Sequence, residues 1–267
     1  MIEKDLFTIA IFEGIEKAEG CPLCYLWTRR ETVLMEHLLR DELVMDPAFR
    51  VSVLDAKGFC NHHMHLLYKA TSARHTDDGL GYAIYMQGVV QRIIADFKSS
   101  PLDRLRRLED LVHNNIFTRS KKSRQAFSHL TEAVEKTVEG QRTCPACEFM
   151  WSSDEMNLHT LVRMLDDKDF REEFGSSKGL CLSHFVSAVR MVSRVRIKNS
   201  VQITRALIEA EMKRLELTEN YLSEFIRKQR WEFRHEPWGP EANANPMVLN
   251  LLVGAEGLLP KLKTFRP

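Results

Sequence analysis

The sequence CPLC at residues 21–24, together with GFCNHH at residues 58–63, decides how this chain folds. Both stretches return later in the chain, as CPAC at residues 144–147 and GLCLSH at residues 179–184. Each half therefore offers two cysteines in a tight turn, and then a cysteine followed three residues later by a histidine. Such self-similarity predicts a duplicated structural unit.

The segments between these motifs extend the repeat. DPAFR at residues 46–50 lies opposite DKDFR at residues 167–171 once a gap of two residues is allowed, and Leu38 lies opposite Leu161. Because the two motifs are separated by similar distances in both halves, we interpret each half as one folding unit.

The six cysteines of the chain all lie in these motifs, and this spacing is typical of metal ligands rather than of disulfides. Following the order of the repeats, we predict two metal ions, each held by three cysteines and one histidine. Three thiolates and one imidazole favour tetrahedral zinc in a structural site. An iron–sulfur centre is the alternative, and copper or another metal stays open because spacing does not discriminate. The predicted ligand sets are Cys21, Cys24, Cys60 and His63 for one ion, and Cys144, Cys147, Cys181 and His184 for the other.

Proline placement and hydrophobic periodicity predict an all-α fold. Long stretches lack proline, and apolar residues recur there at steps of three and four, while strict alternation is hardly found. The longest pattern, from about Asn199 to Phe233, predicts one long helix that packs across both units. The expected divisions are a first metal-binding unit at 1–100, a helical connector at 101–138, a second metal-binding unit at 139–198, and the long helix with a C-terminal docking segment at 199–267, all within one compact fold.

Charge and hydropathy exclude some classes of protein. Lys and Arg number 38 against 37 Asp and Glu, so there is no basic excess to hold a phosphate backbone. The apolar runs are too short to span a bilayer. We expect a soluble, unsecreted protein in the reducing cytoplasm, where thiols stay available to metals.

The sequence favours a binding or assembly scaffold, with a protein or a small ligand as the unknown partner. No P-loop, dinucleotide fingerprint or nucleophile elbow occurs, and the cysteines are committed to metals. A redox or metal-handling enzyme is the alternative, since His62 and His65 have no counterparts in the second half. A nucleic-acid-associated regulator is the second alternative, although Arg104, Arg106 and Arg107 are interleaved with acidic residues.

Several polar residues on the helices after the cysteine turns are candidates to orient the ligands, because a ligating histidine usually donates its other N–H to an acceptor. The mixed charges at 209–216 are interpreted as a solvated helix face. The candidates are Glu31, Glu36, His37, Asp154, Glu155 and His159.

CPLC, DPAF, GFCNHH and the later EPWGPEANANP before LLVG together resemble an uncharacterised bacterial family built around a domain of unknown function. The resemblance covers nearly the whole chain. The family usually has Gly-Phe-Cys-Pro-x-His in the first unit, so Asn61 and His62 depart from it, while Cys60 and His63 keep the ligand frame. The resemblance brings no activity with it.

Overall fold

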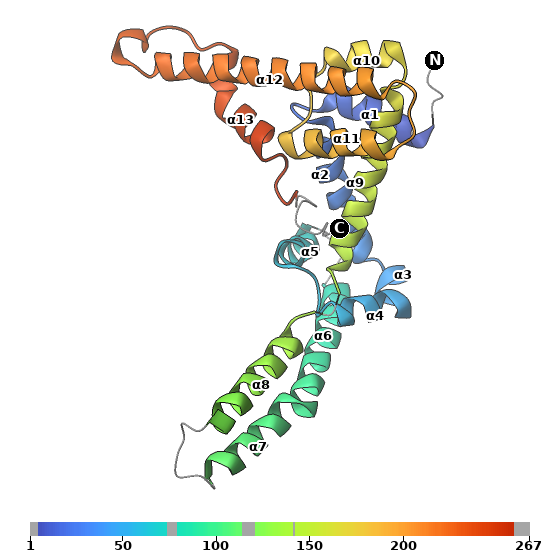
Figure 1. Ribbon diagram of the computed structural model, residues 1–267, viewed down its shortest axis with the longest axis vertical. Helices are drawn as coiled ribbons and strands as arrows, with labels where there is room; N and C mark the ends of the chain where they lie inside the picture. Colours follow the sequence, from blue (N-terminus) through green and yellow to red (C-terminus); the bar gives the residue numbers. More distant parts are fainter. Residues whose placement is uncertain (1–4, 74–78, 114–120, 141, 259–267) are drawn as a thin grey trace. The chain divides into compact units, whose positions relative to one another are not determined.

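The computed structural model describes residues 5–73, 79–113, 121–140 and 142–258, and within these ranges it contains helices and no strand (Figure 1). The all-α prediction is confirmed. No helix in this part of the chain is both long enough and apolar enough to cross a membrane.

In chain order the helices are α1 (Leu6–Lys17), α2 (Pro22–Leu38), α3 (Asp41–Val44), α4 (Pro47–Asp55), α5 (Asn61–Ala73), α6 (Leu80–Ser99), α7 (Pro101–His113), α8 (Lys121–Val138), α9 (Pro145–Met164), α10 (Lys168–Gly175), α11 (Leu182–Arg194), α12 (Ser200–Lys228), the 3₁₀ turns η1 (Trp231–Phe233) and η2 (Pro240–Asn243), and α13 (Ala244–Leu252).

The two copies of the repeat fold into matching series of helices, in which α2 corresponds to α9, α4 to α10, α5 to α11 and α6 to α12. Asp46 caps α4 by accepting the Ala48 N–H at 3.0 Å, and Asp167 caps α10 by accepting the Phe170 N–H at 3.1 Å. Each carboxylate satisfies an N–H group that the first helical turn leaves free. The alignment of DPAFR with DKDFR is therefore confirmed.

The chain divides into two compact units, which we call unit 1 (residues 1–31 and 150–267) and unit 2 (residues 32–149). Unit 1 is thus built from two separate stretches of sequence, and unit 2 is continuous. Helices α7 and α8 pack against one another within unit 2 (Figure 1).

Each unit has its own apolar core. In unit 1, Leu161 and Leu165 of α9 are fully buried together with Ile203 and Leu207 of α12. Burying side chains of this size contributes about 1.5–3 kcal/mol each. Unit 2 centres on Tyr85 of α6.

The Tyr85 ring lies edge-on to Phe49 and Phe59, and its hydroxyl donates to the Leu38 carbonyl at 3.0 Å. Tyr85 therefore ties the end of α2 to α4 and to the loop before Cys60.

The long helix α12 begins where the periodicity predicts and ends at Lys228, five residues before Phe233. Its C-terminal end is fixed by charged contacts with the following turns. The Lys228 ammonium lies 2.6 Å from a Glu241 carboxylate oxygen, and that carboxylate also accepts the Gly239 N–H at 2.7 Å. These contacts turn the chain back toward α13.

Candidate metal centres

The eight predicted ligands come together in two clusters, but their pairing differs from the prediction. Cys21 and Cys24 lie with Cys181 and His184, a cluster we call centre 1, in unit 1. Cys60, His63, Cys144 and Cys147 form centre 2, in unit 2. Each centre therefore takes its Cys-Pro-x-Cys turn from one repeat and its Cys-x-x-His turn from the other. The pairing within each repeat, which followed sequence order, is wrong.

The local geometry of the half-sites agrees with the sequence. Pro22 and Pro145 occupy the first position of α2 and α9, where a missing N–H leaves no helical bond unmade. The second cysteine of each turn lies in the first turn of the same helix. Cys181 directly precedes the first residue of α11, so that His184 lies within the first turn of this helix. The structure of each turn is therefore as expected, and only the pairing of the Cys-Pro-x-Cys turns with the Cys-x-x-His turns differs from the prediction.

All four predicted ligands of centre 1 are buried. His184 Nδ1 lies 3.3 Å from Cys21 Sγ, 3.4 Å from Cys24 Sγ and 3.2 Å from Cys181 Sγ. Cys24 Sγ and Cys181 Sγ are 3.5 Å apart. The imidazole nitrogen therefore faces all three sulfurs.

Centre 2 repeats this arrangement with one difference in exposure. His63 Nδ1 lies 3.2 Å from Cys60 Sγ, 3.7 Å from Cys144 Sγ and 3.3 Å from Cys147 Sγ. Cys60 Sγ and Cys147 Sγ are 3.6 Å apart. His63, Cys144 and Cys147 are buried, but Cys60 is only half-buried. Centre 2 has one ligand that solvent can approach.

These distances fit the room that one tetrahedral ion requires. Thiolates at about 2.3 Å and an imidazole at about 2.0 Å from zinc lie about 3.5 to 3.8 Å from one another. The sulfur–nitrogen and sulfur–sulfur distances given above are equal to these values or a few tenths of an ångström shorter. Both clusters therefore match a single ion in size and in donor type.

The thiols within each centre differ in acidity. The hydrogen bond from Cys144 holds the pKa of Cys60 far below the usual thiol value, and the one from Cys21 does the same for Cys181. The contact with Cys181 raises the pKa of Cys24 to about 12. The cysteine of each Cys-x-x-His turn is therefore favoured as a thiolate, which is the form that binds metals.

Contacts around centre 1 orient and cover its ligands. His184 Nε2 lies 3.0 Å from the Asp154 carboxylate, so that Nδ1 is left to face the sulfurs. The Ala255 N–H donates to Cys24 Sγ at 3.3 Å. A Cβ atom at Gly254 would lie 3.0 Å from Cys181 Sγ and 3.1 Å from Cys24 Sγ, and the positive φ of 83° at Gly254 also favours glycine. The backbone after α13 thus lies directly on two sulfurs.

Glycine at the start of each Gly-x-Cys sequence has a conformational reason. Gly58 has a φ of 101° and Gly179 a φ of 68°, both in the left-handed region that other residues rarely adopt. This turn leads the chain into the following helix with the cysteine at its start. The glycine is thus part of the ligand motif.

The interpretation of residues 209–216 as a solvated face is wrong for Glu211, which is only 3 % exposed. Burial raises the pKa of the Glu211 carboxyl to about 7, and the positive charge of Arg214 acts in the opposite direction. Arg214 donates to the Leu180 carbonyl. Periodicity gives a clue, because Glu211 follows Ile203 and Leu207 at steps of four on the buried face of α12.

The other polar candidates divide by burial. Asp154 contacts His184 as described, whereas Glu36, His37 and Glu155 are exposed and His159 is half-buried. His65 is exposed and His62 is half-buried, and the His62 ring lies edge-on to His63 at 5.2 Å. Glu31 is buried. Sequence reasoning missed the contacts from Gly254 and Ala255, because backbone atoms make them.

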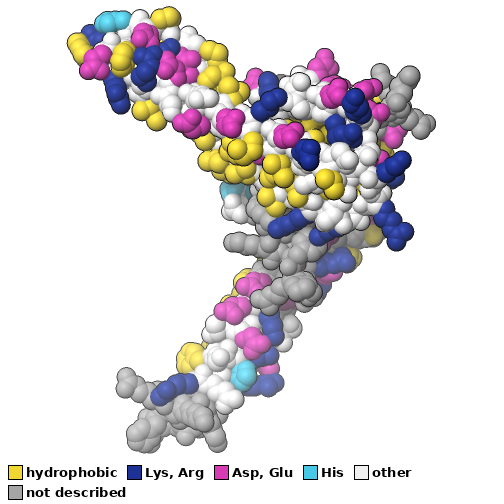
Figure 2. Space-filling model, turned by 45° about the horizontal axis from the view of Figure 1, so that its top comes forward, with side chains coloured by type: hydrophobic (Ala, Val, Ile, Leu, Met, Phe, Trp, Pro, Cys, Tyr) yellow, Lys and Arg dark blue, Asp and Glu magenta, His cyan; other side chains and the backbone are white. Residues whose placement is uncertain are grey.

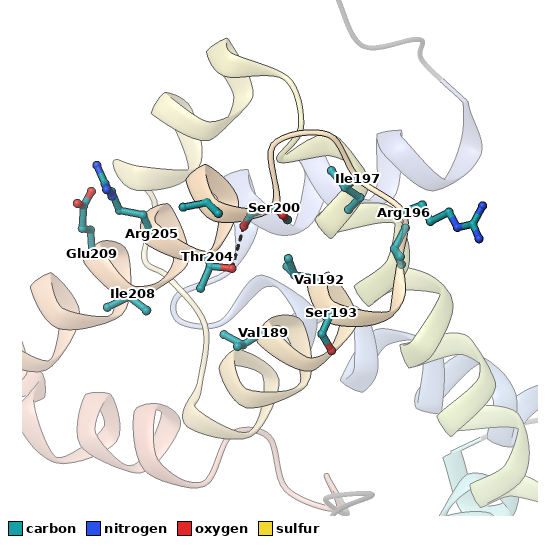
Figure 3. Close-up of a pocket in the computed structure, with 12 residues that line it drawn as sticks. Val189, Val192, Ser193, Arg196, Ile197, Ser200, Thr204, Arg205, Ile208 and Glu209 are labelled. Carbon is teal, nitrogen blue, oxygen red and sulfur yellow. Dashed lines mark hydrogen bonds between the residues drawn. The ribbon is translucent and has the colours of Figure 1, made fainter.

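A groove lies between α11 and α12, with a volume of about 830 Å³ (Figure 3). Val189, Val192 and Ile208 line it, and Arg196 and Arg205 lie at its rim with their guanidinium groups pointing away on different sides. None of the eight cluster residues lines this groove. It is therefore a separate surface feature of unit 1.

Charged side chains of both signs are mixed over the face drawn in Figure 2. In α7, Arg107 pairs with Asp103 at 2.8 Å, and Arg104 donates to the His129 carbonyl at 2.9 Å. Two of the three arginines of α7 thus contact other groups of the chain.

Comparisons with known proteins give a family but no activity. Residues 2–256 match a family described as a family of unknown function (DUF6062). Searches of curated proteins and of solved structures gave no match. Because the match covers nearly the whole chain, the protein belongs to this family of unknown function.

Proposed function

We propose that this protein binds two zinc ions, one in each centre, and acts as a metal-stapled helical scaffold for a binding partner in a reducing compartment. The observation that carries the proposal is the convergence of two Cys₃His sets, each on one point. A saturated set of four protein ligands leaves no position for water or substrate, which is typical of structural zinc.

The separations between ligand atoms support a single ion over an iron–sulfur cluster. A cluster places several irons and sulfides between its ligands, so its thiolates are further apart than those that share one ion. In both centres the measured pairs lie between 3.2 Å and 3.7 Å. A mononuclear iron site has the same ligand geometry as zinc, and elemental analysis distinguishes the two metals.

The chain segments that the centres join support a structural role. Centre 1 joins Cys24 to Cys181, and therefore links the two separate stretches of unit 1. Centre 2 joins His63 to Cys144, and therefore links two segments of unit 2 that are 81 residues apart in the sequence. Because binding energy at such a site is also folding energy, each ion would stabilise its unit.

Anaerobic purification with elemental analysis tests the metal. We expect two zinc ions per chain and no colour. A coloured, reducible chain that contains iron would replace the zinc proposal with a redox one.

Two fourfold variants then test the pairing. In C60A/H63A/C144A/C147A, crossed pairing removes centre 2 alone and leaves one ion. In C21A/C24A/C60A/H63A, crossed pairing damages both centres and leaves none. If the second variant keeps one ion and the first keeps none, the ligands pair within repeats and the crossed centres are refuted.

The groove between α11 and α12 is the surface we propose for the partner, because α11 starts directly after Cys181 and is anchored by His184. Ile208→Asp places a charge on its apolar wall. Recovery of the tagged chain from its native cells should then yield a partner with the wild type and not with the variant, while both hold two ions. The same partner on both chains would place the binding surface elsewhere.

A further inference from the structure

Helix α12 contacts both ligand loops of centre 1, which are residues 20–24 and 179–184. A Cβ atom at Gly20 would lie 3.4 Å from Arg214 Nη2, and one at Gly179 would lie 3.3 Å from Arg214 Cδ. The Arg214 side chain therefore lies against the residue before Cys21 and also against the turn that leads to Cys181.

One side chain of α12 holds Leu180 by its backbone. The Leu180 carbonyl accepts from the Arg214 guanidinium. Leu180 directly precedes Cys181, so this contact fixes the backbone from which a ligand extends. Burial raises the pKa of the Glu211 carboxyl on the same helix, and the positive charge of Arg214 lowers it.

The repeat provides an internal comparison. Val90 and Ile93 of α6 follow Cys60 by 30 and 33 residues, the same offsets by which Glu211 and Arg214 follow Cys181. At centre 2 a Cβ atom at Gly58 would meet the side chains of Met64 and Val89, which are apolar. The charged contacts are therefore a feature of centre 1 and not of the shared motif.

We propose that Arg214 is a positioning residue for centre 1, and that it holds the two ligand loops of that centre at the separation that one metal ion needs. The proposal rests on the proposed metal binding. Outer contacts of this kind typically change metal affinity by about 10–100-fold.

The test uses the full chain loaded anaerobically with two equivalents of Co²⁺, whose visible bands report tetrahedral thiolate coordination. Affinities come from competition with a chromophoric chelator. R214A, and the double variant E211V/R214I that copies the first repeat, should bind one of the two ions about 10–100-fold more weakly and shift the bands of that ion alone. R214K, which keeps one donor for Leu180, should fall between R214A and the wild type.

The matched control is R205A, on the same helix and exposed, which should leave both ions unchanged. If R214A has wild-type affinity and wild-type bands for both ions, the positioning role of Arg214 is refuted. If R214A loses both ions, the result for R214K decides. Weaker binding of one ion by R214K supports the positioning role, and wild-type binding of both ions refutes it. A wild-type chain that binds no metal would instead refute the proposed function itself.

Discussion

Centres 1 and 2 have the same set of three cysteines and one histidine, yet their surroundings differ. In centre 1, Cys181 and His184 are 0 % and 1 % exposed, and the backbone at Gly254 and Ala255 covers two sulfurs. In centre 2, Cys60 is half-buried. The motif therefore determines the donor set, and the parts of the chain packed around it determine how easily solvent, acid or a chelator would reach a bound ion.

Among the substitutions that should affect the two centres differently, serine in place of the buried Cys181 should have the largest effect. Cys181→Ser should lose the ion of centre 1 and several kcal/mol of unfolding free energy, because that ion joins two separate stretches of unit 1. Cys60→Ser should lose only the ion of centre 2. Elemental analysis measures the ions lost, and thermal unfolding measures the loss of stability. An equal loss of unfolding free energy in the two variants would contradict the comparison.

Removal of the metal should follow exposure. Under excess chelator we expect two phases of release, with centre 2 about ten or more times faster than centre 1, because a chelator can attack beside Cys60. Absorbance of the chelator complex follows the release. Cys60→Ser should remove the fast phase and keep the slow one. A single phase for both ions would show that the cover on centre 1 has no kinetic effect.

The carboxylate behind His184 should contribute next. Asp154→Ala should weaken the ion of centre 1 by about 10–100-fold and leave centre 2 unchanged, because the imidazole loses the acceptor that orients it. Competition titration measures this, with Glu216→Ala on the exposed side of α12 as control. Equal affinities in the variant and the wild type would exclude an orienting role.

A substitution in the backbone segment that covers centre 1 should cause the smallest change in stability. Gly254→Ala puts a methyl group beside two sulfurs at a left-handed φ, and should cost about 1–2 kcal/mol. It should also quicken release from centre 1 alone. Gly175→Ala is the matched control, because a Cβ there meets nothing within 4 Å. Unchanged stability in Gly254→Ala would mean that this backbone readily moves aside.

Local features were predictable because they depend on neighbouring residues. The prolines that open α2 and α9, the aspartates that cap α4 and α10, and the length of α12 all follow from short-range rules. Glu211 was misread because charge suggests solvent, whereas its position on the apolar face of α12 placed it in the core.

By itself the sequence determined the all-α class, the duplicated unit and the eight cluster residues, because periodicity and Cys/His spacing act within one turn or one helix. Only the tertiary structure decided the partners, joining Cys24 to Cys181 and Cys60 to Cys147. The physical reason is that the two Cys-Pro-x-Cys turns carry the same donors, so that each can share an ion equally well with either Cys-x-x-His turn. At centre 1 the crossed arrangement is accompanied by the contact of Arg214 with the Leu180 carbonyl and by the Gly254–Ala255 backbone beside Cys24 and Cys181.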